Sequence, residues 1–419
     1  MANLPVGRGV VNVADQSIAP ASTQSIAPAS STTVRRANAR LVLTELWASE
    51  AGDTVTANEL MELTGLTRAT VLAVCDDLVR LGWLQESSGV AAVTTGATAG
   101  RPPRRFSFCA GAGYVVGVDV GDASIRVAVA DLRGGIIGRA RRQAGFAADQ
   151  SAERGVAIRQ VIAAALADAE IPASSVRVIS FGLAAPVRPS GGTPVAAHGT
   201  YWSRMQLDPS AVLAGRPDWQ HWLVLVNNDA NLAALAAGAH GEADPHGDYV
   251  VLLSGERFGA GIVAGGRLLL GRDGGAGDLH FLELISGVGD QKGLAATARR
   301  LWTATPGAAS SLAVFEAARA GDLAATAAVR TLADRLARVV AALASLLNPE
   351  RVIVAGAVAA SLSQLIDLCR QRLPDYAQLP PEVTASALGG DIVLLGAIQA
   401  GIKQLAEGAL DRPAKALAG

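Results

Sequence analysis

Thr67, Arg68, Ala69 and Thr70 form a short run whose side chains are suited to contact DNA bases, by hydrogen bonds from the threonines and the arginine and by apolar contact from the alanine. They stand at the front of a segment whose apolar residues recur at spacings of three and four: Val71, Val74, Leu78 and Leu81. This spacing predicts an amphipathic helix, with Thr67 as its N-cap and Arg68 in its exposed first turn. The N-terminal residues of such a helix contact base edges in the major groove.

Arginines cluster on both sides of this helix. Arg35 and Arg36 open an earlier helical segment, and the run 100–105 places Arg101, Arg104 and a third arginine on a loop that two prolines stiffen. An extended basic loop fits the narrow minor groove or the phosphate backbone. The alternative is a charged run that is only solvated.

Three short helices are predicted to position these residues. The first begins near Thr33, where apolar residues start to recur at helical spacing. Thr56 and Glu59 form a capping box that opens the second helix, and Gly65 supplies the turn into the third.

Two strands are expected to complete this unit. Segments 83–85 and 105–108 flank a polar loop and can pair as a wing. Residues 33–110 are therefore predicted to form a winged helix-turn-helix DNA-binding domain. A three-helix bundle without a DNA role is the alternative.

Beyond residue 110 the pattern alternates between strands and helices. Strands are predicted at 114–120, 125–131 and 176–182, a helix at 152–169, and a second such series from residue 223. In that second series a strand ends at Asn228 and Asp229, at the kind of edge where ligands of α/β proteins usually bind. Two α/β halves around a cleft predict the actin and hexokinase architecture for residues 111–419. An aspartate that only caps the turn is the alternative for Asp229.

Composition limits the possible partners. A formal net charge of −1 means that attraction to DNA must come from the local arginine clusters. The three cysteines are scattered, which indicates neither a disulfide framework nor a structural zinc. Without a long apolar run or a signal-peptide pattern, we expect a cytoplasmic protein with no membrane contact. Residues 1–32 contain a tandem octad of low complexity and are expected to be a disordered tail.

The order of these motifs resembles the ROK family, whose name stands for repressor, open reading frame and kinase. The resemblance covers roughly residues 33–405. Besides the winged-helix segment it rests on glycine turns at 119–124 and 255–261, Asn-Asp-Ala-Asn at 228–231, Gly-Ala-Gly-Asp-Leu-His at 275–280 and Asn-Pro-Glu at 348–350. Members with the N-terminal domain resemble regulators of sugar uptake and catabolism, and members without it are generally sugar kinases. The resemblance therefore implies a transcriptional regulator, with repression as the expected mode.

Departures from the family pattern argue against kinase chemistry. The family's kinases carry Asp-x-Gly-Gly-Thr in the first phosphate turn, where this sequence has Asp122 and a hydroxyl displaced to Ser124. In the second turn, Glu256 and Arg257 stand where the kinases have small residues. Negative charge and bulk at phosphate positions weaken nucleotide binding. We expect a protein that is not an enzyme and needs no cofactor.

The resemblance also implies a sugar site. Asp229 matches the general base of the kinases and would accept a hydrogen bond from a sugar hydroxyl beside Asn228. Asp278 stands where the family has a glutamate that contacts the sugar. His280 is either a shifted ligand contact or an ordinary loop histidine, and Trp202 either stacks on a sugar ring or packs in the core.

The zinc site of the family is missing from the sequence. That site needs a histidine followed by a cluster of three cysteines, whereas no cysteine follows His280 within the corresponding stretch. No metal is therefore expected.

These features predict a homodimer, or a dimer of dimers, that binds a double-stranded DNA operator and senses a sugar or sugar phosphate. Two rivals stay open. One is a regulator whose ROK domain binds no small molecule and serves as a scaffold for dimerisation or for a partner. The other is an ATP-dependent sugar kinase.

Overall fold

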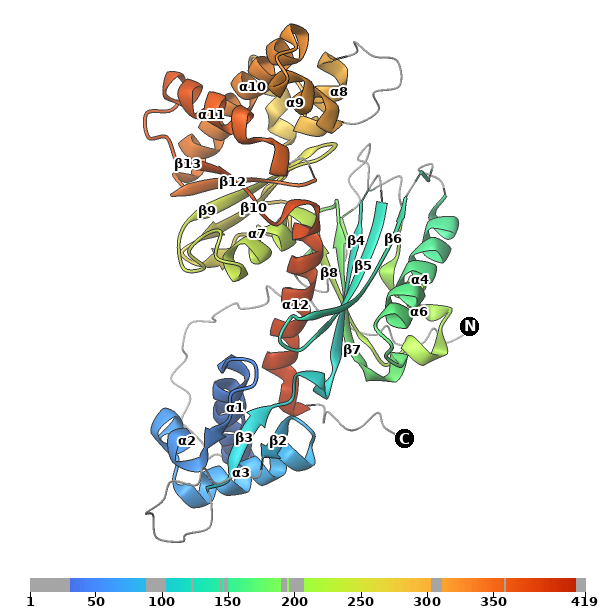
Figure 1. Ribbon diagram of the computed structural model, residues 1–419, viewed down its shortest axis with the longest axis vertical. Coiled ribbons are helices and arrows are strands. Elements are labelled where there is room, and N and C mark those ends of the chain that lie inside the picture. Colours follow the sequence, from blue (N-terminus) through green and yellow to red (C-terminus); the bar gives the residue numbers. More distant parts are fainter. Residues whose placement is uncertain are drawn as a thin grey trace.

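The computed structural model describes residues 31–87, 103–121, 124–143, 145–146, 150–189, 194–195, 207–302, 311–357 and 359–411. These residues form an N-terminal domain and two α/β lobes, which follow one another along the long axis of the molecule (Figure 1). No helix within these ranges is both long and apolar enough to cross a membrane. Three residues singled out in the sequence lie outside the described ranges: Arg101, Asp122 and Trp202.

The N-terminal domain contains three helices and a small sheet. Its elements are α1 (Ser31–Ala48), β1 (Val55–Thr56), α2 (Ala57–Thr64), α3 (Arg68–Arg80), β2 (Leu84–Ser87) and β3 (Arg105–Phe108). β2 and β3 pair antiparallel, as predicted for segments 83–85 and 105–108, and β1 adds a third strand on β3. The predicted helix signals are confirmed, since Thr56 and Glu59 form the capping box and Thr67 caps α3. Gly65 ends α2 at a φ of 69°, a left-handed conformation that glycine adopts without strain.

The first lobe is built on a five-stranded sheet. Its elements are β4 (Tyr114–Val120), β5 (Ser124–Asp131), β6 (Ile136–Gln143), α4 (Ser151–Asp168), β7 (Val176–Leu183), α6 (Pro209–Ala214) and β8 (Leu223–Asn228). The sheet order is β6-β5-β4-β7-β8, in which β4, β5 and β6 are antiparallel and β7 and β8 run parallel to β4. The next helix, α7 (Asp229–Ala239), packs on the sheet of the second lobe.

The second lobe repeats this plan. Its elements are β9 (Tyr249–Ser254), β10 (Phe258–Ala264), β11 (Arg267–Leu268), α8 (Leu294–Leu301), α9 (Ser311–Arg319), α10 (Leu323–Leu347), β12 (Arg351–Ala355), α11 (Ser363–Arg372) and β13 (Glu382–Ala385). The sheet order β11-β10-β9-β12-β13 again joins an antiparallel part to a parallel part. Two sheets of this kind confirm the predicted pair of actin-like and hexokinase-like halves. The last helix, α12 (Ile392–Gly408), packs on β4 and β7 of the first lobe and on α7.

Short 3-10 turns connect these elements: η1 (Ala110–Ala112), η2 (Ala173–Ser175), η3 (Pro217–Trp219), η4 (His280–Leu284), η5 (Ala359–Ser361), η6 (Leu373–Asp375), η7 (Gly389–Asp391) and η8 (Ala409–Asp411). The turn η7 leads directly into α12, and η8 extends the far end of that helix.

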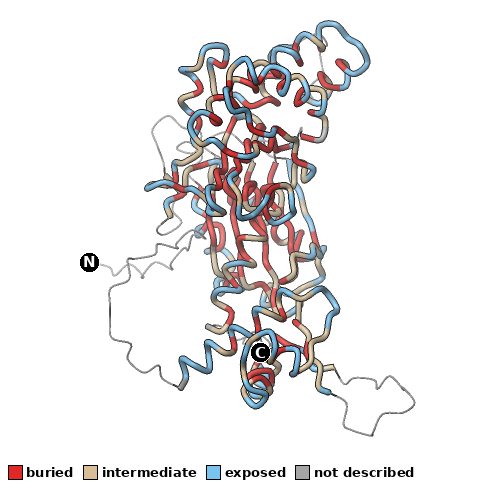
Figure 2. Tube along the Cα trace, turned by 90° about the vertical axis from the view of Figure 1, so that its left-hand side faces the viewer, coloured by how far each residue is buried: buried red, intermediate tan, exposed pale blue. Residues whose placement is uncertain are grey.

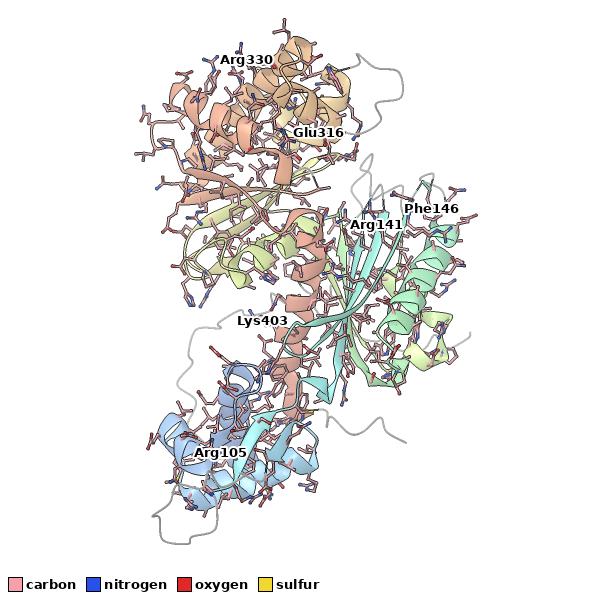
Figure 3. The ribbon with its side chains drawn as sticks, in the orientation of Figure 1. Arg105, Arg141, Phe146, Glu316, Arg330 and Lys403 are labelled. Atoms are coloured by element: carbon pink, nitrogen blue, oxygen red, sulfur yellow. The ribbon has the colours of Figure 1, made fainter. Side chains whose placement is uncertain are left out.

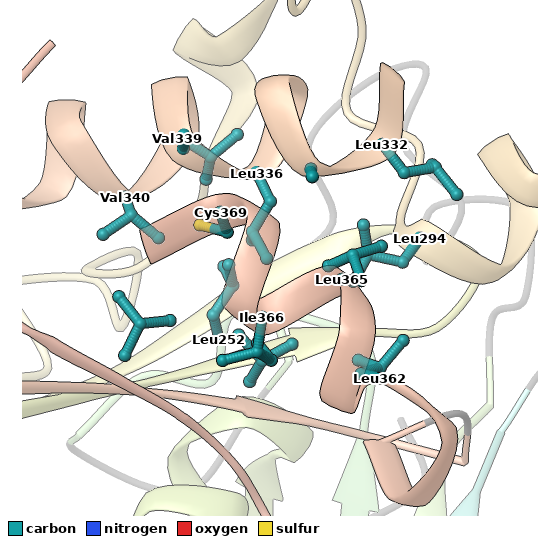
Figure 4. Packing of buried hydrophobic residues seen from close by; sticks show 14 of the residues in the cluster. Leu252, Leu294, Leu332, Leu336, Val339, Val340, Leu362, Leu365, Ile366 and Cys369 are labelled. Atoms are coloured by element: carbon teal, nitrogen blue, oxygen red, sulfur yellow. The ribbon is translucent and has the colours of Figure 1, made fainter. Parts of the chain in front are cut away.

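The buried core runs through both lobes (Figure 2). In the second lobe, α10 and α11 cover one face of the sheet, and residues such as Leu252, Leu336 and Ile366 interlock there (Figure 4). Between the lobes, α7 and α12 touch backbone to backbone, because a Cβ added at Gly396 would lie 1.9 Å from the carbonyl oxygen of Leu232. Only a glycine permits that approach.

The helix α12 extends from the lobes down to the N-terminal domain (Figure 1). Near its C-terminal end, Leu405 is buried in one cluster with Leu46 of α1 and Leu132 of the first lobe. The indole Nε1 of Trp47 also donates to the carbonyl of Leu132 at 2.9 Å. The guanidinium of Arg133 donates to backbone carbonyls at the end of α1 and lies 5.3 Å from the ring centroid of Phe108. The N-terminal domain is therefore packed onto the first lobe and α12 by a shared core.

Candidate functional site

A cavity of about 340 Å³ lies between the two lobes. Its walls come from the β4–β5 turn, the start of α7, the β9–β10 turn, α8, the turn after β12 and the start of α12. Asp119 and Asp229 contribute carboxylates to it, and Arg126 and Arg299 contribute guanidinium groups. The cavity thus combines acceptors and donors for a polar ligand of small size.

Asp119 and Asp229 both have raised pKa values. Burial in the cleft and, to a smaller extent, the neighbouring carboxylate of Asp119 together raise the pKa of Asp229 to about 7. Burial likewise raises the pKa of Asp119 to about 6, although Arg126 opposes this change. Asp229 keeps access to solvent through the cavity, and its Oδ1 accepts a hydrogen bond from the amide of Ala230 at 2.8 Å. Near neutral pH this carboxyl group is able to accept or donate a hydrogen bond.

Arg126 links the first lobe to the start of α12. It donates to the carbonyl oxygen of Gly390 and, at 3.3 Å, to the hydroxyl of Ser124. Carboxylate oxygens of Asp119 and Asp391 lie 3.9 and 3.8 Å away from it. These contacts place a cation at the mouth of the β4–β5 turn, where it also meets the N-terminal end of α12.

Glu256 of the second glycine turn forms an ion pair with a residue of α8. The carboxylate of Glu256 accepts two hydrogen bonds from Arg299 of α8, at 2.6 and 2.5 Å. Both side chains line the cavity. This pair lies at the turn that the sequence pattern associates with phosphate binding.

A buried arginine holds the loop next to this turn. Arg335 of α10 is 5% exposed and donates to the carbonyls of Asp290 and Lys292 at 2.7 and 2.9 Å. It also forms an ion pair with the Asp290 carboxylate at 2.6 Å. The loop in turn pairs with the β10 edge, where the Phe258 amide donates to the carbonyl of Gln291. Arg335 therefore supports the cavity wall from behind.

The residues at this loop do not fit the zinc site that the family pattern implies. His280 is exposed, contacts the side chain of Gln291 and lies 3.9 Å from the Glu283 carboxylate. No thiol stands between His280 and Cys369 in the sequence. One imidazole without thiolate partners does not make a tetrahedral zinc site.

The candidate ligand residues are only partly brought together. Asp229 lines the cavity, whereas the side chain of Asn228 caps α7 by accepting from the Asn231 amide and donates to the Ala185 carbonyl. Asp278 and His280 are exposed and are not among the residues that line the cavity. Their loop nevertheless touches the first lobe, because a Cβ added at Gly274 would lie 1.9 Å from the Val187 carbonyl oxygen.

The candidate DNA-contacting residues of α3 share one surface. Thr67, Arg68 and Ala69 are exposed at its N-terminal end, and Thr70 is half-buried. The hydroxyls of Thr67 and Thr70 lie 2.9 Å apart, and Arg68 donates to the side chain of Asn58 on α2. The opposite face of α3 is buried in the domain core, so this end is presented to the outside.

The flanking arginines have partners within the domain. Arg35 donates to the Asp77 carboxylate of α3 at 2.8 Å, and Arg36 is exposed on the first turns of α1. Arg104 bonds to Glu86 at 2.6 and 2.7 Å and also to Asp76, which ties the β2–β3 hairpin to α3. The sequence did not predict this bracing role for Arg104.

Sequence reasoning did not single out Arg126, Arg299 or Arg335. A usable signal exists for two of them. Arg126 interrupts an otherwise apolar strand, and Arg335 stands between Leu332 and Leu336 on the apolar face of α10. A charge on a buried face requires a partner, so it points to an ion pair even where the partner is unknown.

The fold and the cleft define a two-lobed α/β protein of the actin and hexokinase type, joined to a three-helix N-terminal domain. The model of the ROK family matches residues 115–402, and the chain therefore belongs to the ROK family. In a crystal structure of a ROK family transcriptional regulator, described as a homologue of the E. coli MLC protein, the similarity covers 89% of this chain and 98% of the other. The TM-score is 0.64 and the identity 19%.

Kinases of the same family are also similar. A ROK glucokinase from Streptomyces griseus, solved with glucose and AMPPNP, matches 69% of this chain and 99% of its own at a TM-score of 0.52 and 24% identity. A glucokinase from Halalkalibacterium halodurans is 29% identical over an alignment of 204 residues that covers 41% of this chain. The chain spans only 62% of that curated relative.

Proposed function

We propose that this protein is a DNA-binding transcriptional regulator, acting as a repressor of sugar uptake or metabolism genes, whose cleft senses a sugar or sugar phosphate. The observation that carries the proposal is the course of α12. Its first residues, Ile392 and Val393, line the cleft, and its last turns share a core with the N-terminal domain. A ligand and an operator would therefore bind at opposite ends of one continuous structure.

In this mechanism a ligand in the cleft changes the closure of the two lobes. Arg126 and Asp391 join the first lobe to the start of α12, and Gly396 holds that helix against α7. Closure would move the second lobe relative to the body formed by the first lobe, α12 and the N-terminal domain, and would thereby change the spacing of paired N-terminal domains on DNA. A homodimer or a dimer of dimers on a double-stranded operator is part of the proposal. The ROK regulator that is similar over 89% of this chain supports the proposal of a regulator, because the similarity extends beyond the two lobes.

The sensing step can be tested by thermal melting against sugars, sugar phosphates and ATP. A ligand that binds only the folded protein at ~100 times its dissociation constant adds about 2.7 kcal/mol to the free energy of unfolding. We expect a shift with a sugar or sugar phosphate and none with ATP. No shift with any compound would favour the scaffold role of the ROK domain.

Replacing Arg68 by alanine should weaken specific operator binding by ~1–3 kcal/mol, because a base-contacting arginine contributes on that scale. The operator can be selected from random DNA with the wild-type protein, and affinity can be measured by fluorescence anisotropy. Arg80→Ala is the matched control, since Arg80 is exposed at the other end of α3. Equal affinities for both variants would remove Arg68 from base recognition.

A sugar kinase is the second candidate, and Asp229 favours it. A carboxyl group with a pKa of about 7 in a cleft is suited to act as a general base near neutral pH. The glucokinases among the relatives agree with this reading. The Glu256–Arg299 pair in the phosphate region argues against it. Sugar-dependent conversion of ATP to ADP, abolished in Asp229→Asn, would establish the kinase and displace the non-enzymatic proposal.

A further inference from the structure

The outward face of α3 carries two alanines between charged residues. Four exposed residues follow one another on it at spacings of four, three and four: Ala69, Ala73, Asp76 and Arg80. Arg68 is exposed beside the first of them, and the opposite face of the helix is buried in the domain core. α3 lies on the side of the N-terminal domain that faces away from the lobes (Figure 1). This face is therefore accessible to a DNA groove.

The charged residues in the C-terminal half of α3 are paired within the domain. Arg104 donates to the Asp76 carboxylate at 2.5 Å. The next carboxylate, that of Asp77, accepts hydrogen bonds from Arg80 at 2.7 Å and from Arg35 of α1 at 2.8 Å. These ion pairs neutralise the two carboxylates of α3, which would otherwise repel the phosphates of DNA. They also engage the oxygens that a cytosine amino group would need as acceptors.

Arg68 is held by the neighbouring helix through an uncharged partner. Its Nη1 donates to the side-chain oxygen of Asn58 on α2, and in the described part of the chain its Nε and Nη2 have no partner. This edge of the guanidinium carries two parallel N–H donors, which match the O6 and N7 acceptors of guanine in the major groove. The hydrogen bond to Asn58 restricts the long side chain, so less conformational entropy is lost on binding.

Ala69 and Ala73 offer a different kind of contact. Their methyl groups form no hydrogen bonds, but they can pack against the C5 methyl group of thymine, which projects into the major groove. At 1.5 Å per residue the two alanines are about 6 Å apart along the helix axis. Two base-pair steps of DNA span about 6.8 Å. The two methyl groups therefore match thymines about two base pairs apart, and their small size allows α3 to approach the base edges closely.

We propose that α3 reads one guanine through Arg68, with Asn58 as the positioning residue, and reads thymine methyl groups about two base pairs apart through Ala69 and Ala73. The inference rests on the proposed function, because it names the class of DNA sequence that the proposed regulator recognises. Each operator half-site then combines one required G·C pair with thymines beside it.

Base analogues in an operator selected from random DNA test each contact on the unmodified protein. Replacing the recognised guanine by 7-deazaguanine removes N7, and affinity should fall about tenfold, because a hydrogen bond to a charged donor is lost. Inosine is the matched control, since it keeps both O6 and N7 and should bind like guanine. Replacing a recognised thymine by deoxyuridine removes only the methyl group, and affinity should fall about fourfold.

Protein variants assign these contacts to residues. Arg68→Ala should no longer distinguish guanine from 7-deazaguanine, and Ala69→Gly and Ala73→Gly should each stop distinguishing thymine from deoxyuridine at one position. Asn58→Ala should reduce the discrimination at the guanine and leave that at the thymines unchanged, which a general loss of folding would not do. Circular dichroism melts establish that the variants are folded.

The outcomes separate this inference from the function on which it rests. A selection that enriches no sequence overturns the proposed DNA binding and this inference with it. An enriched operator without a required guanine, or one whose affinity is unchanged by 7-deazaguanine or by deoxyuridine, overturns the inference alone. Equal discrimination at the guanine by Asn58→Ala and the wild type overturns the role of Asn58.

Discussion

Replacing Arg335 by alanine should lower the free energy of unfolding by about 3–5 kcal/mol, which is the range measured when one partner of a buried ion pair is removed. Arg335 is 5% exposed. Its guanidinium pairs with the Asp290 carboxylate and donates hydrogen bonds to the carbonyls of Asp290 and Lys292. Its removal leaves these acceptors without their donor and opens a cavity under α10. Urea denaturation at neutral pH measures the change.

The same helix offers a matched control. Arg330 is an exposed arginine of α10, near the outer end of the second lobe (Figure 3), so Arg330→Ala should change stability by less than about 0.5 kcal/mol. Asp290→Asn removes the charge but keeps the shape, and it should fall between the two. Equal stability of Arg335→Ala and Arg330→Ala would show that the loop does not depend on this ion pair. The cleft loop would then be held by other contacts.

Asp229→Asn should stabilise the protein at alkaline pH and change it little at acidic pH. The folded-state pKa of Asp229 is raised to about 7, well above the ~3.9 of an unfolded aspartate. Between about pH 4 and pH 7 the folded protein therefore binds more protons than the unfolded chain. The contribution of Asp229 to stability falls as the pH rises through this window and is level above it. The full shift corresponds to at most about 4 kcal/mol at ~1.4 kcal/mol per pKa unit, and access of solvent through the cleft reduces it.

Urea denaturation of the wild type and Asp229→Asn at pH 5 and pH 8 checks this expectation. The gain of the variant over the wild type should be larger at pH 8. Asp53→Asn makes the same chemical change at an exposed site and should give the same difference at both pH values. If the stability that Asp229→Asn gains over the wild type does not grow with pH, this carboxyl group is well solvated in the folded protein. That result would weaken both the proposal that Asp229 binds a ligand and the proposal that it acts as a general base.

The two predictions concern the same cleft from opposite sides. Arg335 supports the wall formed by the β9–β10 turn, and Asp229 lies where α7 begins. If Arg335→Ala also abolished the melting shift that a sugar produces, the loop would be required for binding as well as for stability. A retained shift would limit Arg335 to a structural role.

Much of the architecture could be read from the sequence, because its signals are local. The capping box of Thr56 and Glu59, the cap at Thr67 and the turn at Gly65 each involve residues only a few positions apart. Strand and helix periodicity likewise predicted the two α/β halves and placed Asp229 at the end of β8. Such patterns depend on the conformation of one short segment, so no knowledge of the tertiary packing is needed to recognise them.

The electrostatic partners were decided only by the tertiary structure. Arg126 meets Gly390, Arg299 meets Glu256 and Arg335 meets Asp290 across 264, 43 and 45 residues of sequence. The shared core of α12 and the N-terminal domain also joins opposite ends of the chain. Composition and spacing reveal that a buried charge needs a partner, but they do not say which one. That choice follows from how whole helices and sheets pack, since packing alone brings distant residues within hydrogen-bonding distance.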